Sequence, residues 1–190
     1  MLSGLYKYMN TIHPLSDEII QEFERCFEYV EVPKAQSLLR DSEICNYTYV
    51  ITNGLVRMYY QKDGQEISSM FIEEDTPFNA PDSYYSRTPG YLCLDALEPT
   101  RLARIHYNQL QSMYLKFPEL NFVGRVITEK YFVKSEERLY LLRKQTGEER
   151  YSYFLTHYPE LIQRVPLKYI ASYLGLSFET LSRIRNKIRK

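Results

Sequence analysis

The last expected helix of this sequence carries side chains that can read DNA bases. Between Ser177 and Ile188, its exposed positions hold carboxylate, guanidinium, hydroxyl and amide groups. An arginine such as Arg183 can bond a guanine edge through two donors, and Glu179 can accept a hydrogen bond from cytosine. Hydroxyl groups and the N–H groups at a helix start can hold phosphate. The sequence therefore predicts a DNA-binding surface made by Lys168, Ser177, Phe178, Glu179, Thr180, Ser182, Arg183, Asn186 and Lys187.

Residues 165–188 have the pattern of two short helices joined by a tight turn. Ile170 and Leu174 are apolar four residues apart, and the small Ala171 between them lets a second helix cross closely. Gly175 stands where such a turn needs positive φ. These features predict a helix-turn-helix. A plain helical hairpin is the alternative, and the basic exposed face of the second helix argues against it.

Charge is distributed unevenly along the chain. The 190 residues contain 24 Lys and Arg against 24 Asp and Glu, so the formal net charge is zero. Residues 1–115 hold 9 basic and 16 acidic side chains, whereas residues 160–190 hold 7 and 2. An acidic body with a basic C-terminal end is typical of a module that meets a polyanion.

A long helix is expected at about 119–143, ahead of the basic segment. Phe122, Val126, Val133 and Tyr140 form one apolar stripe, and Leu120, Val123, Ile127, Tyr131 and Leu141 form a second. Two stripes give a face wide enough to pack on its own domain and on a partner helix, which predicts a homodimer. Burial within the monomer alone is the alternative. Gly147 should end this helix, and Thr146 with Glu149 fits a capping box that starts the next one.

Short β-rich stretches fill residues 30–110, after an expected helix at 15–29 capped by Ser16. Tyr47–Thr52 ends at Asn53-Gly54, and a second turn lies at Asp63-Gly64. Because Asn and Gly accept positive φ cheaply, both dipeptides predict hairpins. Several short strands at this spacing predict an antiparallel roll or barrel.

Several classes of protein are excluded by what the sequence contains. The three widely spaced cysteines form no disulfide framework and no zinc-binding pair. The apolar runs are far shorter than the roughly 20 residues that span a bilayer, and the first residues do not read as a signal peptide. The expected location is the cytoplasm, with no membrane partner.

No enzyme is expected either. The three histidines, His13, His106 and His157, fall in different segments, whereas a metal-dependent β-barrel enzyme needs ligands that converge. The sequence also contains no GxSxG, Walker or HExxH motif. We therefore predict no catalytic residues and no metal site.

Residues 170–184 resemble the helix-turn-helix of the Crp/Fnr superfamily of bacterial transcription regulators. The segments 54–67 and 95–102 are similar to the β-roll of cyclic-nucleotide-binding domains, so the resemblance covers nearly the whole chain in order. It implies an α+β fold: an antiparallel β-roll of the double-stranded β-helix or jelly-roll type with flanking helices, a long dimerisation helix, and a winged-helix-like helix-turn-helix domain with little or no wing. The implied parts are a sensor at 1–117, a dimerisation helix at 118–144 and a DNA-binding domain at 145–190.

The resemblance also implies a function and partners. The chain is expected to be a dimeric transcription regulator that binds a two-fold symmetric operator in double-stranded DNA and meets RNA polymerase. Glu179 and Arg183 take the base-reading positions, while Phe178 stands where many members have a further arginine. The alternative is a ligand-binding signalling module whose helical end binds protein.

A small-molecule effector is expected in the roll, with Asn79, Asp82, Ser83, Arg87 and Thr88 as candidate pocket residues. Arg87 and Thr88 suit an anion, because an arginine fork and a hydroxyl both bond phosphate. The family's cyclic AMP binders also carry a Gly-Glu pair, which this segment lacks. We therefore expect an unidentified ligand, or a pocket filled by its own side chains, in preference to a cyclic nucleotide. The scattered cysteines also differ from the cluster of iron–sulfur sensors.

Overall fold

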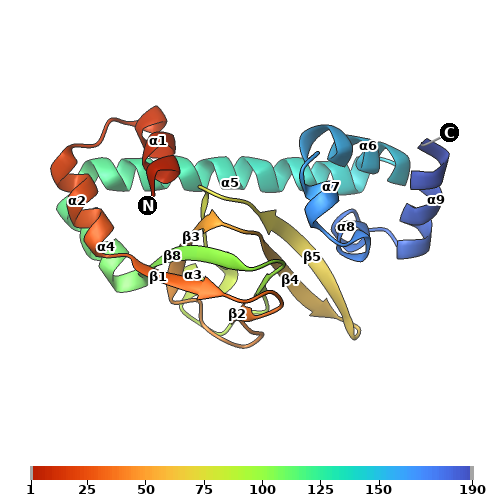
Figure 1. Ribbon diagram of the computed structural model, residues 1–190, viewed down its shortest axis with the longest axis horizontal. Coiled ribbons are helices and arrows are strands. Elements are labelled where there is room, and N and C mark those ends of the chain that lie inside the picture. Colours follow the sequence, from red (N-terminus) through yellow and green to blue (C-terminus); the bar gives the residue numbers. More distant parts are fainter. Residues whose placement is uncertain (1, 189–190) are drawn as a thin grey trace. The chain divides into compact units, whose positions relative to one another are not determined.

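The computed structural model describes residues 2–188 (Figure 1). Strands lie between residues 28 and 106, and helices precede and follow them, so the fold is α+β as predicted. Contacts within the chain define two compact units. Unit 1 contains Met1–Met58 and Phe71–Lys130, and unit 2 contains Tyr59–Met70 and Tyr131–Lys190. The predicted division into 1–117, 118–144 and 145–190 stays a prediction, because the boundary between the two compact units falls between Lys130 and Tyr131, inside the expected long helix.

Two helices precede the roll: α1 (Ser3–Ile12) and α2 (Asp17–Arg25). The hydroxyl of Ser16 accepts the backbone N–H of Ile19, so Ser16 caps α2 as predicted. The helix expected at 15–29 ends earlier, because the chain from Glu28 onward pairs with a distant strand. The helix α1 was not predicted.

The roll is built from two four-stranded sheets, in the orders β1-β8-β3-β6 and β2-β7-β4-β5. Their strands are β1 (Glu28–Val32), β2 (Ser37–Leu39), β3 (Tyr47–Asn53), β4 (Val56–Lys62), β5 (Gln65–Ile72), β6 (Pro77–Phe78), β7 (Cys93–Ala96) and β8 (Thr100–His106). Two further helices lie at α3 (Pro81–Ser86) and α4 (Tyr107–Lys116). Fully buried aliphatic side chains of the strands, including Ile51, Leu94, Leu102 and Ile105, form the core of unit 1.

The hairpin predicted at Asn53-Gly54 is wrong. The strands on either side of it, β3 and β4, belong to different sheets, so the chain turns a corner here. The N–H of Leu55 bonds the hydroxyl of Thr100 at 3.3 Å, and its carbonyl accepts the N–H of Leu97 at 2.8 Å. A Cβ on Gly54 would lie 2.5 Å from the Thr100 hydroxyl oxygen. Contacts with Leu97 and with Thr100, the first residue of β8, therefore hold the chain at this corner.

The second predicted hairpin is present. Strands β4 and β5 are neighbours in their sheet (Figure 1), and the turn residues Asp63 and Gly64 have φ of 51° and 75°. Positive φ at both central positions suits the right-handed twist of a two-residue hairpin.

The helices that follow the roll begin with α5 (Pro118–Lys144), which has 27 residues and covers the expected 119–143. Then come α6 (Gly147–His157), α7 (Leu161–Arg164), α8 (Leu167–Tyr173) and α9 (Phe178–Ile188). The predicted capping box is present: Thr146 and Glu149 bond each other's backbone N–H groups. The Glu149 carboxylate accepts the backbone N–H and the hydroxyl of Thr146, and these two bonds hold the pKa of the carboxyl below its usual value. Among the described helices, none is long and apolar enough to cross a membrane.

Candidate nucleic-acid interface

Helices α8 and α9 form the predicted helix-turn-helix. Gly175, with φ of 64°, ends α8 in the left-handed conformation. The N–H of Leu176 bonds the carbonyl of Ala171 at 2.9 Å, and the N–H of Gly175 bonds that of Ser172 at 3.1 Å. This pair of bonds satisfies the last carbonyls of α8 and fixes the exit of the chain. The packing side of the motif is formed by buried Ile170, Ala171, Leu181 and Ile184.

The first turn of α9 is held by its own side chains. The hydroxyl of Ser177 accepts the N–H of Thr180 at 3.1 Å, as an N-cap does. The hydroxyl of Thr180 accepts a 3.4 Å hydrogen bond from Nη2 of Arg183. Bonds from its own backbone N–H and the Ser177 hydroxyl, together with the charge of Arg183, hold the pKa of the Glu179 carboxyl below its usual value. The two predicted base readers are therefore charged and lie on adjacent turns.

The predicted DNA-binding residues are largely accessible. Thr180 and Ser182 are half-buried, and the other seven are exposed: Lys168, Ser177, Phe178, Glu179, Arg183, Asn186 and Lys187. The ammonium of Lys168 lies over the ring of Tyr169, 4.7 Å from its centre. The exposed face of α9 thus presents the mixture of donors and acceptors that the sequence indicates.

Lys187 has a partner that the sequence analysis missed. Its ammonium lies 2.7 Å and 3.0 Å from the two carboxylate oxygens of Glu148, at the start of α6. Both side chains are exposed, and an exposed ion pair of this kind contributes about 0–1 kcal/mol. A phosphate can therefore compete with Glu148 for Lys187. The two residues are 39 positions apart in the sequence, so no local signal indicated this pair.

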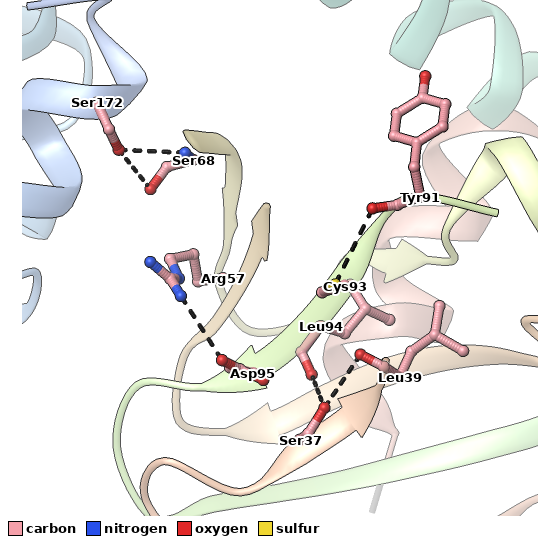
Figure 2. A network of polar contacts seen from close by, with 9 residues as sticks. All are labelled: Ser37, Leu39, Arg57, Ser68, Tyr91, Cys93, Leu94, Asp95 and Ser172. Atoms are coloured by element: carbon pink, nitrogen blue, oxygen red, sulfur yellow. Dashed lines mark hydrogen bonds and ion pairs between the residues drawn. The ribbon is translucent and has the colours of Figure 1, made fainter. Parts of the chain in front are cut away.

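The position of α8 depends on residues outside the motif. The hydroxyl of Ser172 accepts the N–H of Ser68, on β5, at 3.1 Å, and the two hydroxyls lie 2.9 Å apart (Figure 2). From α5, Nη2 of Arg138 donates to the carbonyls of Ser68 and Tyr173 at 3.1 Å and 3.2 Å. From α6, Nη1 of Arg150 donates to the carbonyl of Leu174. Three separate segments of unit 2 thus hold the end of α8 that leads into the turn.

The candidate effector residues serve their own segment of the roll. Asp82 accepts the backbone N–H groups of Ser83, Tyr91 and Leu92. The hydroxyl of Ser83, which is fully buried, accepts the N–H of Cys45 at 3.1 Å. These bonds tie the loop around α3 to the rest of unit 1.

Arg87 and Thr88 are also engaged locally. The guanidinium of Arg87 donates to the carbonyls of Cys45 and Tyr84 and to the side-chain oxygen of Asn46. It also lies over the ring of Tyr107, 4.2 Å from its centre. The hydroxyl of Thr88 lies 2.8 Å from that of Ser86. Asn79 is half-buried. The structure does not assemble these side chains around a common anion site, and their role in ligand binding stays a prediction.

A buried arginine in unit 1 was missed by the sequence analysis. Arg57, on β4, is 1% exposed, and its Nη2 lies 3.6 Å from a carboxylate oxygen of Asp95 on β7 (Figure 2). A charge this deep needs a carboxylate or hydrogen-bonding partners, because desolvation alone costs several kcal/mol. Nothing near Arg57 in the sequence indicated that Asp95 would be its partner.

No family model matches the chain. Among curated proteins, it is 24% identical over 173 residues to the transcriptional activator protein FnrA of Stutzerimonas stutzeri, covering 83% of this chain and 68% of FnrA. It is 21% identical over 183 residues to the transcriptional activatory protein AadR of Rhodopseudomonas palustris, covering 90% of this chain and 74% of AadR.

Solved structures share the fold. FixK2 from Bradyrhizobium japonicum matches with a TM-score of 0.75 at 20% identity, over 86% of this chain and 84% of FixK2. CLP from Xanthomonas campestris, described as a c-di-GMP responsive global regulator, matches with a TM-score of 0.74 at 16% identity, over 92% of each chain. The curated relatives are transcription regulators and not enzymes, in agreement with the sequence analysis. These matches run over most of the chain, in the predicted order of roll, long helix and helix-turn-helix, and the chain is thus similar to transcription regulators of the Crp/Fnr type.

Proposed function

We propose that the protein binds double-stranded DNA as a homodimer, with α9 of each subunit in a major groove. The observation that carries this proposal is the exposed face of α9, where Glu179 lies in the capped first turn and Arg183 lies one turn later. Both residues are charged and both present groups that match base edges. Two-fold symmetry requires two half-sites about 34 Å apart, one helical turn of DNA.

Dimerisation is supported by the burial pattern along α5. Three residues of one predicted stripe, Leu120, Val123 and Ile127, are buried within unit 1, and the other two, Tyr131 and Leu141, are half-buried. Large apolar side chains of the same helix are exposed in the single chain: Phe122, Phe132, Val133, Leu139 and Tyr140. A row of exposed apolar side chains is typical of a surface that meets a partner. A second copy of α5 matches it, because a two-fold axis brings the same face of both helices together.

The proposal includes Lys187 as a phosphate contact and Arg183 as a base contact. An effector in the roll and contact with RNA polymerase stay predictions from the family. We do not extend the proposal to a cyclic nucleotide, because the donors of Arg87 already bond protein acceptors.

Selection of binding sites from a random pool of double-stranded DNA tests the proposal. The purified full chain should enrich an inverted repeat whose half-site centres are about 10–10.5 base pairs apart. Arg183→Ala serves as the matched variant, since it should lose the preference at one position of each half-site. Enrichment of single half-sites would contradict the dimer. No enrichment, with the chain folded, would favour the alternative in which the helical end binds protein.

A further inference from the structure

A cavity in unit 2 is lined by two arginines. It lies among α5, α6 and the end of α8, with a volume of about 290 Å³ that includes open solvent at its mouth. Arg138, Arg150, Tyr153 and Tyr173 supply its polar groups, and leucine and phenylalanine side chains supply the rest. No Asp or Glu is found among the described residues of its wall.

Only part of the Arg150 guanidinium is hydrogen-bonded to described residues of the protein. Its Nη1 donates to the carbonyl of Leu174. Within residues 2–188, no acceptor bonds its Nε or Nη2, and Nε is buried from solvent. The Nε–Nη2 edge of an arginine is a pair of parallel donors that matches two oxygens of a carboxylate or phosphate. Arg150 therefore brings to the cavity wall one donor without a protein acceptor, Nη2, whereas its Nε stays closed to solvent.

Arg138 is similar in its charge and its burial. Its guanidinium lies over the ring of Tyr173, 4.5 Å from the centre, and its Nε is buried with no acceptor in the described part of the chain. Neither Arg138 nor Arg150 forms an ion pair with any described residue. Burial lowers the pKa of Arg138, because the charged form loses its hydration. Buried charges in proteins are normally paired.

Capping of α8 accounts for part of this arrangement. The last carbonyls of a helix carry partial negative charge and attract cations. That role occupies Nη2 of Arg138 and Nη1 of Arg150. This capping role leaves the Nε groups of Arg138 and Arg150, and Nη2 of Arg150, without acceptors among the described residues. The end of α8 therefore does not by itself explain two positive charges at one cavity.

We propose that this cavity binds a small inorganic oxyanion such as phosphate. An oxyanion supplies the negative charge that the wall lacks, with Nη2 of Arg150 as its main contact. Because part of the 290 Å³ is open solvent, the enclosed space is smaller than the roughly 300–1,000 Å³ of pockets for drug-sized ligands, which favours an ion. Since the same two arginines hold the end of α8, bound phosphate should also stabilise the helix-turn-helix against unfolding.

Titration of the full chain with sodium phosphate tests the proposal, by calorimetry and by thermal unfolding at constant ionic strength set with sodium chloride. The wild type should show saturable binding to one site and a rise in Tm, as expected for a ligand of the folded state. Arg150→Gln should raise the Kd for phosphate by about tenfold or more. Arg143→Gln, which removes an exposed arginine of the same helix as Arg138, should leave the Kd unchanged.

Arg150→Lys keeps the test informative if Arg150→Gln does not fold. Lysine retains the positive charge and one donor for the Leu174 carbonyl, but has no second nitrogen in the place of Nη2. It should keep the circular dichroism spectrum of the wild type and still weaken phosphate binding. Absence of saturable binding to the wild type would overturn the proposal. Equal weakening by Arg143→Gln would overturn it too, because the anion would then respond to general surface charge.

Discussion

Replacement of Gly175 by alanine tests how the turn between α8 and α9 is held. Gly175 has φ of 64°, and a Cβ there would lie 3.0 Å from Nη1 of Arg150. An L-residue in the left-handed region costs about 1–2 kcal/mol. Displacing Nη1 from the carbonyl of Leu174 loses a hydrogen bond to a charged group, a further loss of about 1.5–3 kcal/mol when complete. Since the arginine side chain can partly adjust, we expect Gly175→Ala to reduce the free energy of unfolding by about 2–4 kcal/mol.

Gly64→Ala is the matched control, because it isolates the backbone part of this loss. Gly64 has φ of 75°, and a Cβ there would meet nothing within 4 Å. Its loss should therefore stay near the backbone cost of about 1–2 kcal/mol. Urea unfolding followed by circular dichroism measures both variants against the wild type. Equal losses would show that Arg150 does not restrain the turn. A stable Gly175→Ala variant would refute the requirement for positive φ.

Three further predictions concern the interface and its supports. Arg183→Ala should weaken binding to the selected DNA site by about 1–3 kcal/mol and relax the preference at one base pair. Fluorescence anisotropy measures the binding. Equal weakening on all DNA sequences would exclude base reading by Arg183. Glu148→Gln should free Lys187 and strengthen binding to all DNA sequences by up to about 1 kcal/mol. Lys187→Ala should reduce the slope of log K against log salt concentration by about one. An unchanged slope would mean that Lys187 contacts no phosphate. Thr146→Ala should reduce the free energy of unfolding by about 1 kcal/mol through loss of the N-cap. The folded-state pKa of Glu149 is lowered, so its contribution is present above its unfolded pKa and is lost as the pH falls through the folded value. Thr146→Ala removes the hydroxyl bond but keeps the larger backbone N–H bond to the Glu149 carboxylate, so it should flatten the acid limb of a Tm-versus-pH curve only in part.

Several features followed from the sequence because they depend on neighbours only a few residues away. The capping box at Thr146 and Glu149, the turn at Gly175 and the Asp63-Gly64 hairpin are all decided by local backbone geometry. The length of α5 followed from its apolar period for the same reason. Local backbone geometry of this kind does not depend on where the segment lies in the fold.

Other features depended on contacts between distant segments. Asn53-Gly54 looks like a hairpin turn, yet Thr100 diverts the chain into a second sheet. Glu28 onward pairs with β8, which ends α2 earlier than its apolar pattern indicated. Nη1 and Nη2 of Arg87 bond Cys45, Tyr84 and Asn46, which the sequence did not indicate, and the role of Arg87 in ligand binding stays a prediction.

The sequence by itself determined the order of the parts and the side chains on the exposed face of α9. Both follow from helical period and turn residues, which act over one or two turns of chain. Only the tertiary structure decided which partners the charged groups of the long polar side chains bond. Lys187 forms an ion pair with Glu148, and Arg138 and Arg150 donate hydrogen bonds to carbonyls at the end of α8. A guanidinium or ammonium group can reach many acceptors, and the fold, by bringing distant segments together, selects among them.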